Sequence, residues 1–392
     1  MKIFIIPSWY PSRLHPESGS FFKQRAAMLE NYGHEVTVVT AQIHSLSDWR
    51  PTRGMRLPQF SRDNNSQLPT FRYEALNRHP FMPRRFLANY RRKLIRLFKL
   101  ACQQQGQPQV VMVNSSLWAG FALAEYLADL AIPFVVSEHL KEFIVPPGFD
   151  EYQQTALRTT YGKAAAIVAT SPALADGITR HFPAFTRKIV HIANPVDTDF
   201  FHPPDQVISH ERQFSLVTVA LLRPEKRIDL LLRALALLKS TGLTLHLTVA
   251  GDGPERKALQ RLTAKLKLEN QVRFVGYCPP QQVRRHLENS HALVLPSDVE
   301  TFGVVLIEAL ACGRPVVATD CGGPGSIIGP ENGILVEPGN AKALADGIRD
   351  LVNNYGKYSA GDIRQTTVDN YSPAVYGKVY TGLLEQISAD SE

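Results

Sequence analysis

Short apolar runs alternate along the chain with longer segments in which apolar residues recur every three or four positions. The short runs predict buried parallel strands, and the longer segments predict the helices that connect them. In the first half we expect strands at 2–6, 35–40, 109–114, 133–137, 165–169 and 188–192, with helices at 18–32, 84–104, 117–130 and 171–181. In the second half we expect strands at 214–220, 244–250, 272–275, 292–296, 315–319 and 334–336, with helices at 224–239, 254–268, 280–288, 303–311 and 341–353. This alternation predicts an α/β fold made of two doubly wound, Rossmann-like domains.

The length of 392 residues also favours two domains, because one hydrophobic core rarely serves so long a chain. We expect a first domain over 1–195 and a second over 196–372, joined by the polar, proline-containing stretch 194–212. Residues 45–69 are rich in Ser, Asn, Arg and Pro and are interpreted as a long loop. Ligands of such domains bind at the carboxyl ends of the strands, so we expect a site in a central cleft that both domains face.

Composition agrees with a globular protein, since 44% of the residues are hydrophobic and 20% are charged. No apolar run is long enough to span a bilayer, and Pro7 cuts the opening run too short for a signal peptide. The four cysteines show no C-x-x-C spacing, which favours a reducing compartment over a disulfide framework or a zinc site. We therefore expect a cytoplasmic protein.

The net charge of +7 is concentrated in the first half, where residues 1–200 hold 23 Lys and Arg against 15 Asp and Glu. Residues 75–124 hold eight basic side chains and no acidic one. The helix predicted at 84–104 combines an apolar stripe with a basic rim that includes Arg84, Arg85, Arg91, Arg92, Lys93 and Arg96. Such a helix can lie on the anionic inner face of a membrane, or its stripe can pack on its own sheet, and both can hold at once. The stacked aromatic residues of a nucleic-acid-binding surface are absent, so no nucleic-acid partner is expected.

The strongest chemical signal begins at Glu300 and reaches Glu308, directly after an apolar strand. Gly303 starts a helix that Gly313 ends, so the free N–H groups of the first turn are exposed after the strand. Such a helix end binds anions, and a diphosphate suits it. Glu300 could meet the far end of the ligand and Glu308 the near end, where sugar hydroxyl groups would donate to the carboxylates.

This segment resembles the E-x7-E signature of the retaining glycosyltransferases of family 4, which have the GT-B fold and include enzymes of bacterial cell-surface polysaccharide synthesis. The resemblance implies that Glu300 contacts the donor sugar and that Glu308 contacts the ribose. It also implies that the residues between them bind the donor, namely Thr301, Phe302, Gly303, Val304 and Val305. The final helix, 373–388, is then expected to cross back to the first domain.

Further matches follow the order of that family along the chain. The loop at Gly19 resembles the glycine-containing loop that approaches the diphosphate, and His139 resembles the first-domain histidine near the sugar. In the second domain Lys226 matches the lysine that holds the diphosphate, and Gly251 matches a glycine turn. The usual arginine position is Leu221 here, and Arg223 is the candidate to replace it.

The sequence thus predicts an enzyme that moves a hexose-type sugar from a nucleoside-diphosphate sugar to a hydroxyl group, with Glu300, His139 and Lys226 as its catalytic residues. A lipid-linked saccharide is the acceptor that the basic helix and the resemblance favour. No metal or other cofactor is expected, and Asp197-Thr198-Asp199 is not interpreted as a metal site. Two alternatives stay open: a nucleotide-sugar epimerase of the same fold, and an inert membrane-associated scaffold.

Overall fold

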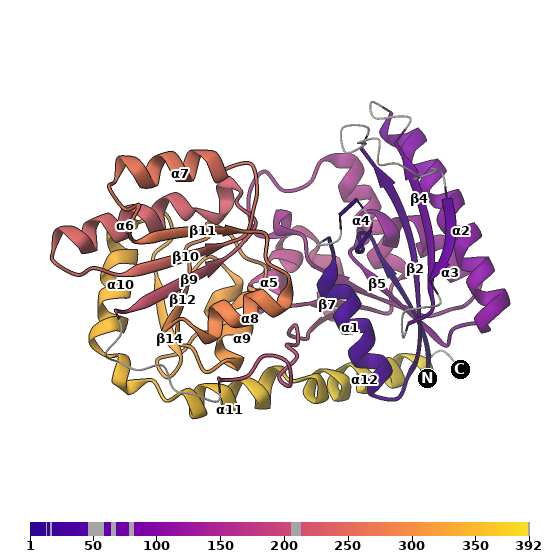
Figure 1. The fold of residues 1–392 in the computed structure, drawn as a ribbon. Helices are drawn as coiled ribbons and strands as arrows, with labels where there is room; N and C mark the ends of the chain where they lie inside the picture. Colours follow the sequence, from indigo (N-terminus) through magenta and orange to yellow (C-terminus); the bar gives the residue numbers. More distant parts are fainter. Residues whose placement is uncertain are drawn as a thin grey trace. The chain divides into compact units, whose positions relative to one another are not determined.

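The computed structural model describes residues 1–12, 14–15, 18–45, 59–63, 68–77, 82–204 and 213–390. The chain forms two compact units, each with its own sheet and its own hydrophobic core (Figure 1). Unit 1 comprises Met1–Thr170, Leu174–Ile192 and Gly377–Glu392, and unit 2 comprises Ser171–Ala173 and Ala193–Tyr376.

The described strands of unit 1 form one sheet in the order β3-β4-β2-β1-β5-β6-β7-β8. All neighbours are parallel except β3 and β4, which pair antiparallel. The strands are β1 (Lys2–Pro7), β2 (Glu35–His44), β3 (Gln59–Asp63), β4 (Thr70–Leu76), β5 (Val110–Asn114), β6 (Phe134–Glu138), β7 (Ala166–Ala169) and β8 (Ile189–His191). The helices are α1 (Ser20–Asn31), α2 (Pro83–Gln105), α3 (Phe121–Asp129), α4 (Glu151–Lys163) and α5 (Pro172–His181), with a short π-helical turn η2 (Ser116–Gly120) before α3. The central strand β1 is buried almost throughout, as expected for a parallel sheet covered on both faces.

Unit 2 has a parallel sheet in the order β11-β10-β9-β12-β13-β14, which is the order of a dinucleotide-binding domain. The strands are β9 (Ser215–Val219), β10 (His246–Ala250), β11 (Val272–Gly276), β12 (Ala292–Leu295), β13 (Val316–Thr319) and β14 (Gly333–Val336). The helices are α6 (Ile228–Ser240), α7 (Arg256–Lys265), α8 (Pro280–Glu288), α9 (Val304–Ala311), α10 (Ala341–Asn353) and α11 (Ala360–Tyr371). Helices α6 and α10 pack together, as do α9 and α11 (Figure 1).

These two sheets confirm the predicted pair of Rossmann-like units, but one local prediction is wrong. Residues 59–63 lie in the segment that was expected to be a loop, and they form the edge strand β3 instead. Strand β4 and helices α4 and α11 add to the predicted elements. The remaining part of that expected loop, except for Leu68, Pro69 and Ser45, lies outside the described residues.

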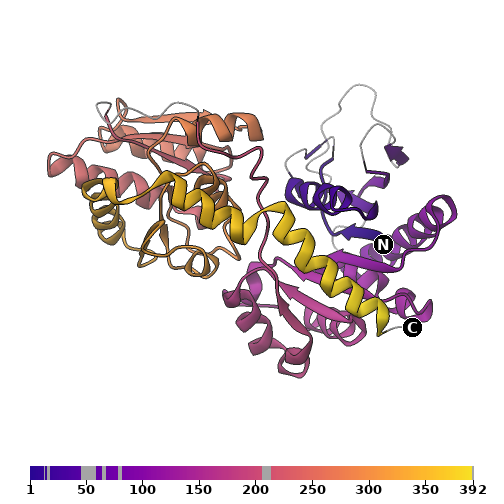
Figure 2. The same cartoon turned by 90° about the horizontal axis from the view of Figure 1, so that it is seen from below.

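The last helix, α12 (Pro373–Ala389), starts in unit 2 and ends in unit 1. Its second half packs on α1 and on the residues just after it (Figure 2). There Thr381 Oγ1 lies 2.7 Å from His34 Nε2. Tyr380 is fully buried there. Unit 1 is therefore completed by the C-terminal segment of the chain, which agrees with a final helix that crosses back.

The apolar stripe of α2 packs into the core of unit 1, so the helix does not present that stripe to its surroundings. Part of the basic rim has partners in the same unit. Arg91 forms an ion pair with Glu125 at 2.7 Å, and Lys93 and Arg96 both lie over the ring of Phe60. Arg84, Arg85 and Arg92 remain exposed. Within the described residues, the structure holds no helix with the length and hydropathy of a membrane span.

Candidate active site

The loops after β9 and β12 bring two of the predicted catalytic residues together in unit 2. Lys226 ends the short helical turn η5 (Pro224–Lys226), and its Nζ donates to Oε1 of Glu300 at 2.7 Å. Ser297 Oγ donates to the same oxygen, also at 2.7 Å. Both partners of the ion pair are largely buried, with 23% of the lysine and 13% of the glutamate side chain exposed. Glu300 is therefore held in one orientation by two protein donors.

A second pair of contacts fixes the same two loops to each other. Nη1 of Arg227 donates to both carboxylate oxygens of Asp298, at 3.0 and 3.1 Å. The backbone N–H of Asp298 donates to the carbonyl of Glu225 at 2.9 Å. This charge-assisted contact and the backbone bond tie the loop of Lys226 to the loop of Glu300.

The amide end of α9 follows the Glu300 loop. Gly303 precedes the helix with φ 99°, in the left-handed region that glycine adopts without strain. The N-cap residue Gly303 has no side chain that could cap this end, and Val304 and Val305 are both partly exposed. The orphan N–H groups and the positive end of the helix dipole make this a place where an anion is stabilised.

Glu308 lies one turn further along α9, and the residue is only partly exposed. Burial of its carboxyl group raises its pKa to about 7. The group is thus partly protonated at neutral pH and can both donate to and accept from a hydroxyl group. Such a carboxyl is suited to a ribose.

Backbone packing explains why several residues around Glu300 are glycine. Gly323 donates its N–H to the carbonyl of Glu300 at 2.8 Å, and a Cβ at Gly323 would lie 2.3 Å from the Cα of Phe302. Phe302 itself is buried, and the carbonyl of Thr301 accepts a hydrogen bond from Ser171 Oγ at 2.7 Å. These residues therefore shape the loop, with their side chains or carbonyls engaged by the protein.

The other predicted donor residues of unit 2 lie in neighbouring loops. Arg223 is exposed, and no hydrogen bond or ion pair of its side chain occurs within the described part of the chain. Gly251 packs against the loop after β9, where a Cβ would lie 1.8 Å from the carbonyl oxygen of Ala220. No hydrogen bond or ion pair joins either residue to Glu300 in the described structure. Their roles remain predictions.

Unit 1 holds the remaining two predicted residues. Arg25 Nη1 lies 3.2 Å from His139 Nε2, and Ser137 Oγ lies 3.1 Å from the same nitrogen. An arginine only donates, so Nε2 accepts and the ring proton sits on Nδ1. Burial, and then the charge of Arg25, hold the pKa of His139 well below its usual range. The imidazole is therefore neutral and presents an Nδ1–H donor.

Gly19 precedes α1 with φ 68°, and a Cβ there would lie 2.6 Å from the carbonyl oxygen of Trp9. Trp9 contacts Phe22 with ring centroids 5.4 Å apart, and Phe22 lies 5.0 Å from His139. The predicted glycine loop and the predicted histidine are thus connected through two aromatic rings. Gly19 is required by this close backbone approach, whatever its contact with a ligand.

Three further residues surround the predicted ones in the structure. Ser297 holds Glu300, Arg25 holds His139, and Glu138 is fully buried beside it. A serine at a strand end gives little sequence signal. Arg25 lies at helical spacing from Phe22 and Leu29, on the face expected to be buried, and this was the available hint, because a buried arginine needs a polar partner.

Two family models match the chain, one for each half. The model described as glycosyltransferase family 4 matches residues 20–200, and the model described as glycosyl transferases group 1 matches residues 203–365. The chain belongs to the family 4 glycosyltransferases. It is accordingly a retaining glycosyltransferase that uses a nucleotide-sugar donor.

Relatives and solved structures agree with this assignment. The transferase is 27% identical over 365 residues to TuaC of Bacillus subtilis, a glycosyltransferase assigned to teichuronic acid biosynthesis, and the match covers 89% of this chain and 88% of that one. The sucrose-phosphate synthase of Thermosynechococcus elongatus has a TM-score of 0.79 at 20% identity and covers both chains completely. HepE of Anabaena in complex with UDP and glucose has a TM-score of 0.72 at 19% identity and covers 98% of this chain and 100% of that one. The two structures confirm the GT-B fold.

Proposed function

We propose that this transferase moves a hexose from a nucleoside-diphosphate sugar to a hydroxyl group of a lipid-linked saccharide, during assembly of a cell-surface polysaccharide. The Lys226–Glu300 pair, next to the amide end of α9 that begins after Gly303, is the observation that carries the donor part of the proposal. The acceptor part is supported by the similarity to TuaC over most of both chains.

In this proposal unit 2 binds the donor. The N–H groups of Val304 and Val305, together with Lys226 and Arg223, stabilise the negative charge that develops on the diphosphate as it leaves. Glu308 accepts or donates a hydrogen bond at the ribose. Glu300 accepts hydrogen bonds from the hexose, in the orientation that Ser297 and Lys226 already hold.

The reaction exchanges one bond for another on the same face of the sugar. The bond between the anomeric carbon and the diphosphate oxygen breaks, and the bond from that carbon to the acceptor oxygen forms. The acceptor proton passes to the departing phosphate oxygen, so no external base is required. His139, as a neutral donor through Nδ1–H, orients the hexose, and it stays neutral because burial lowers its pKa.

We further propose that the enzyme works at an anionic membrane surface through charge alone. The exposed side chains of Arg84, Arg85 and Arg92 support this, since each basic residue contributes about 1 kcal/mol near such a surface. The apolar stripe of α2 is already packed in unit 1 and contributes nothing. Attachment should therefore be reversed by salt.

The donor is tested with a thermal-shift panel of UDP-, GDP- and ADP-sugars, of which one should stabilise the enzyme. Replacing Glu300 by Gln should then lower sugar transfer about 100-fold or more, because a group aimed at the transition state is lost. The nucleotide alone should still bind. A Glu269→Gln variant, on an exposed residue of the same unit, is the matched control and should transfer normally.

Unchanged transfer by the Glu300→Gln enzyme would refute the assignment of that residue. Donor incubated without acceptor checks the alternative of an epimerase, because only an epimerase would convert the donor into its epimer. A chain that no nucleotide sugar stabilises would contradict the proposed donor altogether.

A further inference from the structure

A hollow of about 690 Å³ lies in unit 1. We call it the Trp118 pocket. It is lined by Met82, Arg84, Arg85, Trp118, Asp150, Glu151 and Tyr152. Its volume is in the range of pockets that bury a small ligand.

Aromatic rings form the middle of the Trp118 pocket. The ring centroids of Trp118 and Tyr152 lie 5.9 Å apart with an interplanar angle of 36°. Phe121 supports Tyr152 from α3 in an edge-to-face contact at 6.4 Å. Trp118 and Tyr152 are both partly exposed and line the pocket, so part of each ring is accessible from it. Flat rings of this kind bind the apolar C–H face of a sugar.

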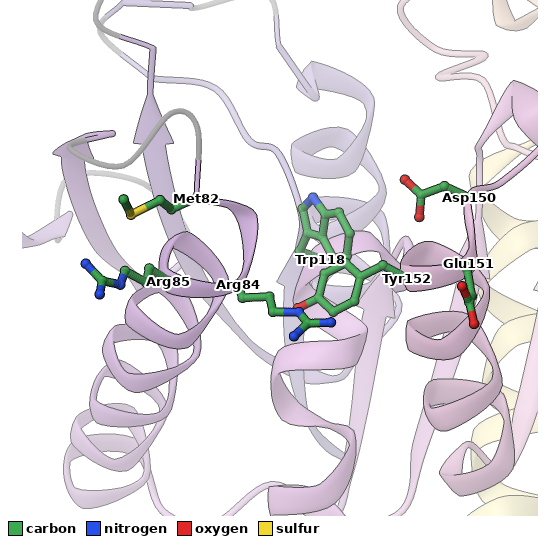
Figure 3. A pocket seen from close by; sticks show the side chains of 7 residues that line it. All are labelled: Met82, Arg84, Arg85, Trp118, Asp150, Glu151 and Tyr152. Atoms are coloured by element: carbon green, nitrogen blue, oxygen red, sulfur yellow. The ribbon is translucent and has the colours of Figure 1, made fainter.

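Charges of opposite sign flank the rings. Figure 3 shows Arg85 on one side of Trp118 and Tyr152, Arg84 extending from that side to the ring of Tyr152, and Asp150 and Glu151 on the other side. Both arginines are exposed. Asp150 Oδ1 accepts a hydrogen bond from the N–H of Gln153 at 2.8 Å, so this carboxylate is fixed by the capping box of α4. One edge of a ligand would meet cations and the opposite edge would meet hydroxyl-binding carboxylates.

A second, smaller hollow of unit 1 shares Trp118 with the Trp118 pocket. It has a volume of about 290 Å³, and Trp118 and Trp9 both line it. It also lies at the carboxyl ends of β1 and β2, since Ser8 and His44 line it too. Trp9 contacts Phe22, and Phe22 contacts His139. The two hollows therefore adjoin at Trp118, and Trp9, on the wall of the second one, lies two ring contacts from His139.

We propose that the Trp118 pocket binds a sugar residue of the acceptor that carries a negative group, a phosphate or a carboxylate, at a position remote from the reacting hydroxyl. The sugar stacks on Trp118 and Tyr152, its negative group pairs with Arg84 and Arg85, and its hydroxyl groups donate to Asp150 or Glu151. This rests on the proposed function, because it assigns the remote part of the acceptor in the same reaction.

Calorimetric titration of the full-length enzyme tests the pocket without turnover. The ligands are short oligosaccharides that carry a phosphate, the same oligosaccharides that carry a uronate, and neutral ones of equal length. At least one acidic class should bind about tenfold more tightly than the neutral class, and added salt should reduce that difference. Comparing the phosphate with the uronate series identifies which source of charge the pocket accepts.

Variants locate the binding. Arg84→Glu combined with Arg85→Glu should abolish the preference for acidic ligands, and Tyr152→Leu should weaken acidic and neutral ligands alike, whereas Tyr152→Phe should keep the stacking. Lys163→Glu combined with Lys257→Glu changes the net charge equally on exposed residues outside the pocket and should leave binding unchanged. Circular dichroism checks that each variant is folded.

Several outcomes would overturn the proposal. They are equal binding of acidic and neutral ligands, no binding of any oligosaccharide, or an acidic preference that survives the double charge reversal. The double charge reversal at Arg84 and Arg85 could also stop the enzyme from sedimenting with phosphatidylglycerol vesicles while saccharide binding stays intact. That result would assign the two arginines to a membrane instead. The donor thermal shift is measured in parallel: its absence refutes the proposed function, whereas its presence with no oligosaccharide binding refutes only this pocket.

Discussion

At the scale of single residues, Glu138 shows how burial controls ionisation in unit 1. Its side chain is fully buried at the end of β6, where Oε1 accepts from Tyr161 Oη at 2.9 Å and from the N–H of Ser116 at 3.2 Å. Oε2 is buried without a hydrogen-bond partner in the described structure. Burial outweighs these hydrogen bonds and raises the pKa of Glu138 to about 7.

The raised pKa predicts a pH-dependent stability. Between pH 4.5 and 7 the folded protein keeps a proton that the unfolded chain has released, so the stability from Glu138 is present at low pH and is lost as pH rises through 7. The loss should approach about 3 kcal/mol. Glu138→Gln keeps the accepting oxygen but cannot ionise, so its free energy of unfolding should lack this loss.

Urea unfolding of both proteins at pH 5, 6, 7 and 8 measures the effect. Glu308 titrates in the same window in unit 2, so the relevant quantity is the difference between wild type and variant, followed through the unfolding transition of unit 1. A difference that stays constant with pH would show that Glu138 is not the titrating group.

Residue-scale prediction from sequence succeeded where a motif is local. Lys226 and Glu300 were both named, and the structure places their side chains 2.7 Å apart. Arg25 was missed because its contacts come from His139 and Tyr380, which lie 114 and 355 residues away along the chain. No local pattern encodes a partner at such a separation.

At the scale of elements, α4 ends without the left-handed glycine that closes many helices. Lys188, which lies outside the helix, caps this end instead of a glycine. Its Nζ donates to the carbonyls of Tyr161, Gly162 and Ala164 at 3.0, 3.0 and 2.8 Å. A cation is also favoured by the negative end of the helix dipole.

Lys188→Met should therefore destabilise unit 1 by about 1–2 kcal/mol, because three carbonyls lose a charged donor while the apolar stem is retained. Thermal unfolding, and amide hydrogen exchange over the last turn of α4, measure the loss. Arg187→Met, on the exposed neighbour, is the control and should change little. Equal unfolding midpoints for the two variants would contradict a capping role for Lys188.

Elements were predicted well where their own pattern is strong and poorly where pairing creates them. The parallel strands are short apolar runs, and most were located within two residues. Strand β3 is the polar sequence Gln59-Phe60-Ser61-Arg62-Asp63, which has no apolar alternation. Its structure comes from antiparallel pairing with β4 and from Lys93 and Arg96 over Phe60. Such support is tertiary, so the sequence of the segment alone could not reveal it.

At the scale of the whole molecule, the two ends of the chain meet in unit 1. Tyr380 of α12 is completely buried, and its hydroxyl group lies 3.4 Å from Arg25 Nη2. Arg25 in turn contacts Ser137 Oγ and His139 Nε2, both at 3.2 Å. The C-terminal helix is thus part of the support of the predicted catalytic histidine, although the segment from Ala193 to Tyr376 belongs to unit 2.

Replacing Tyr380 by Ala should consequently affect the two units differently. The cavity should destabilise unit 1 by about 3–5 kcal/mol, and sugar transfer should fall because Arg25 loses the side chain that holds it. Tyr380→Phe removes only the hydroxyl group and should cost about 1 kcal/mol. Hydrogen exchange should increase in β1 and β6 while unit 2 keeps its protection, and the donor should still raise the unfolding temperature of unit 2. Val379→Ala, on a neighbour that is 46% exposed, should leave both units unchanged. If Tyr380→Ala instead weakened protection in unit 2 and spared unit 1, α12 would belong energetically to the unit it leaves, and the link from Tyr380 through Arg25 to His139 would be incidental.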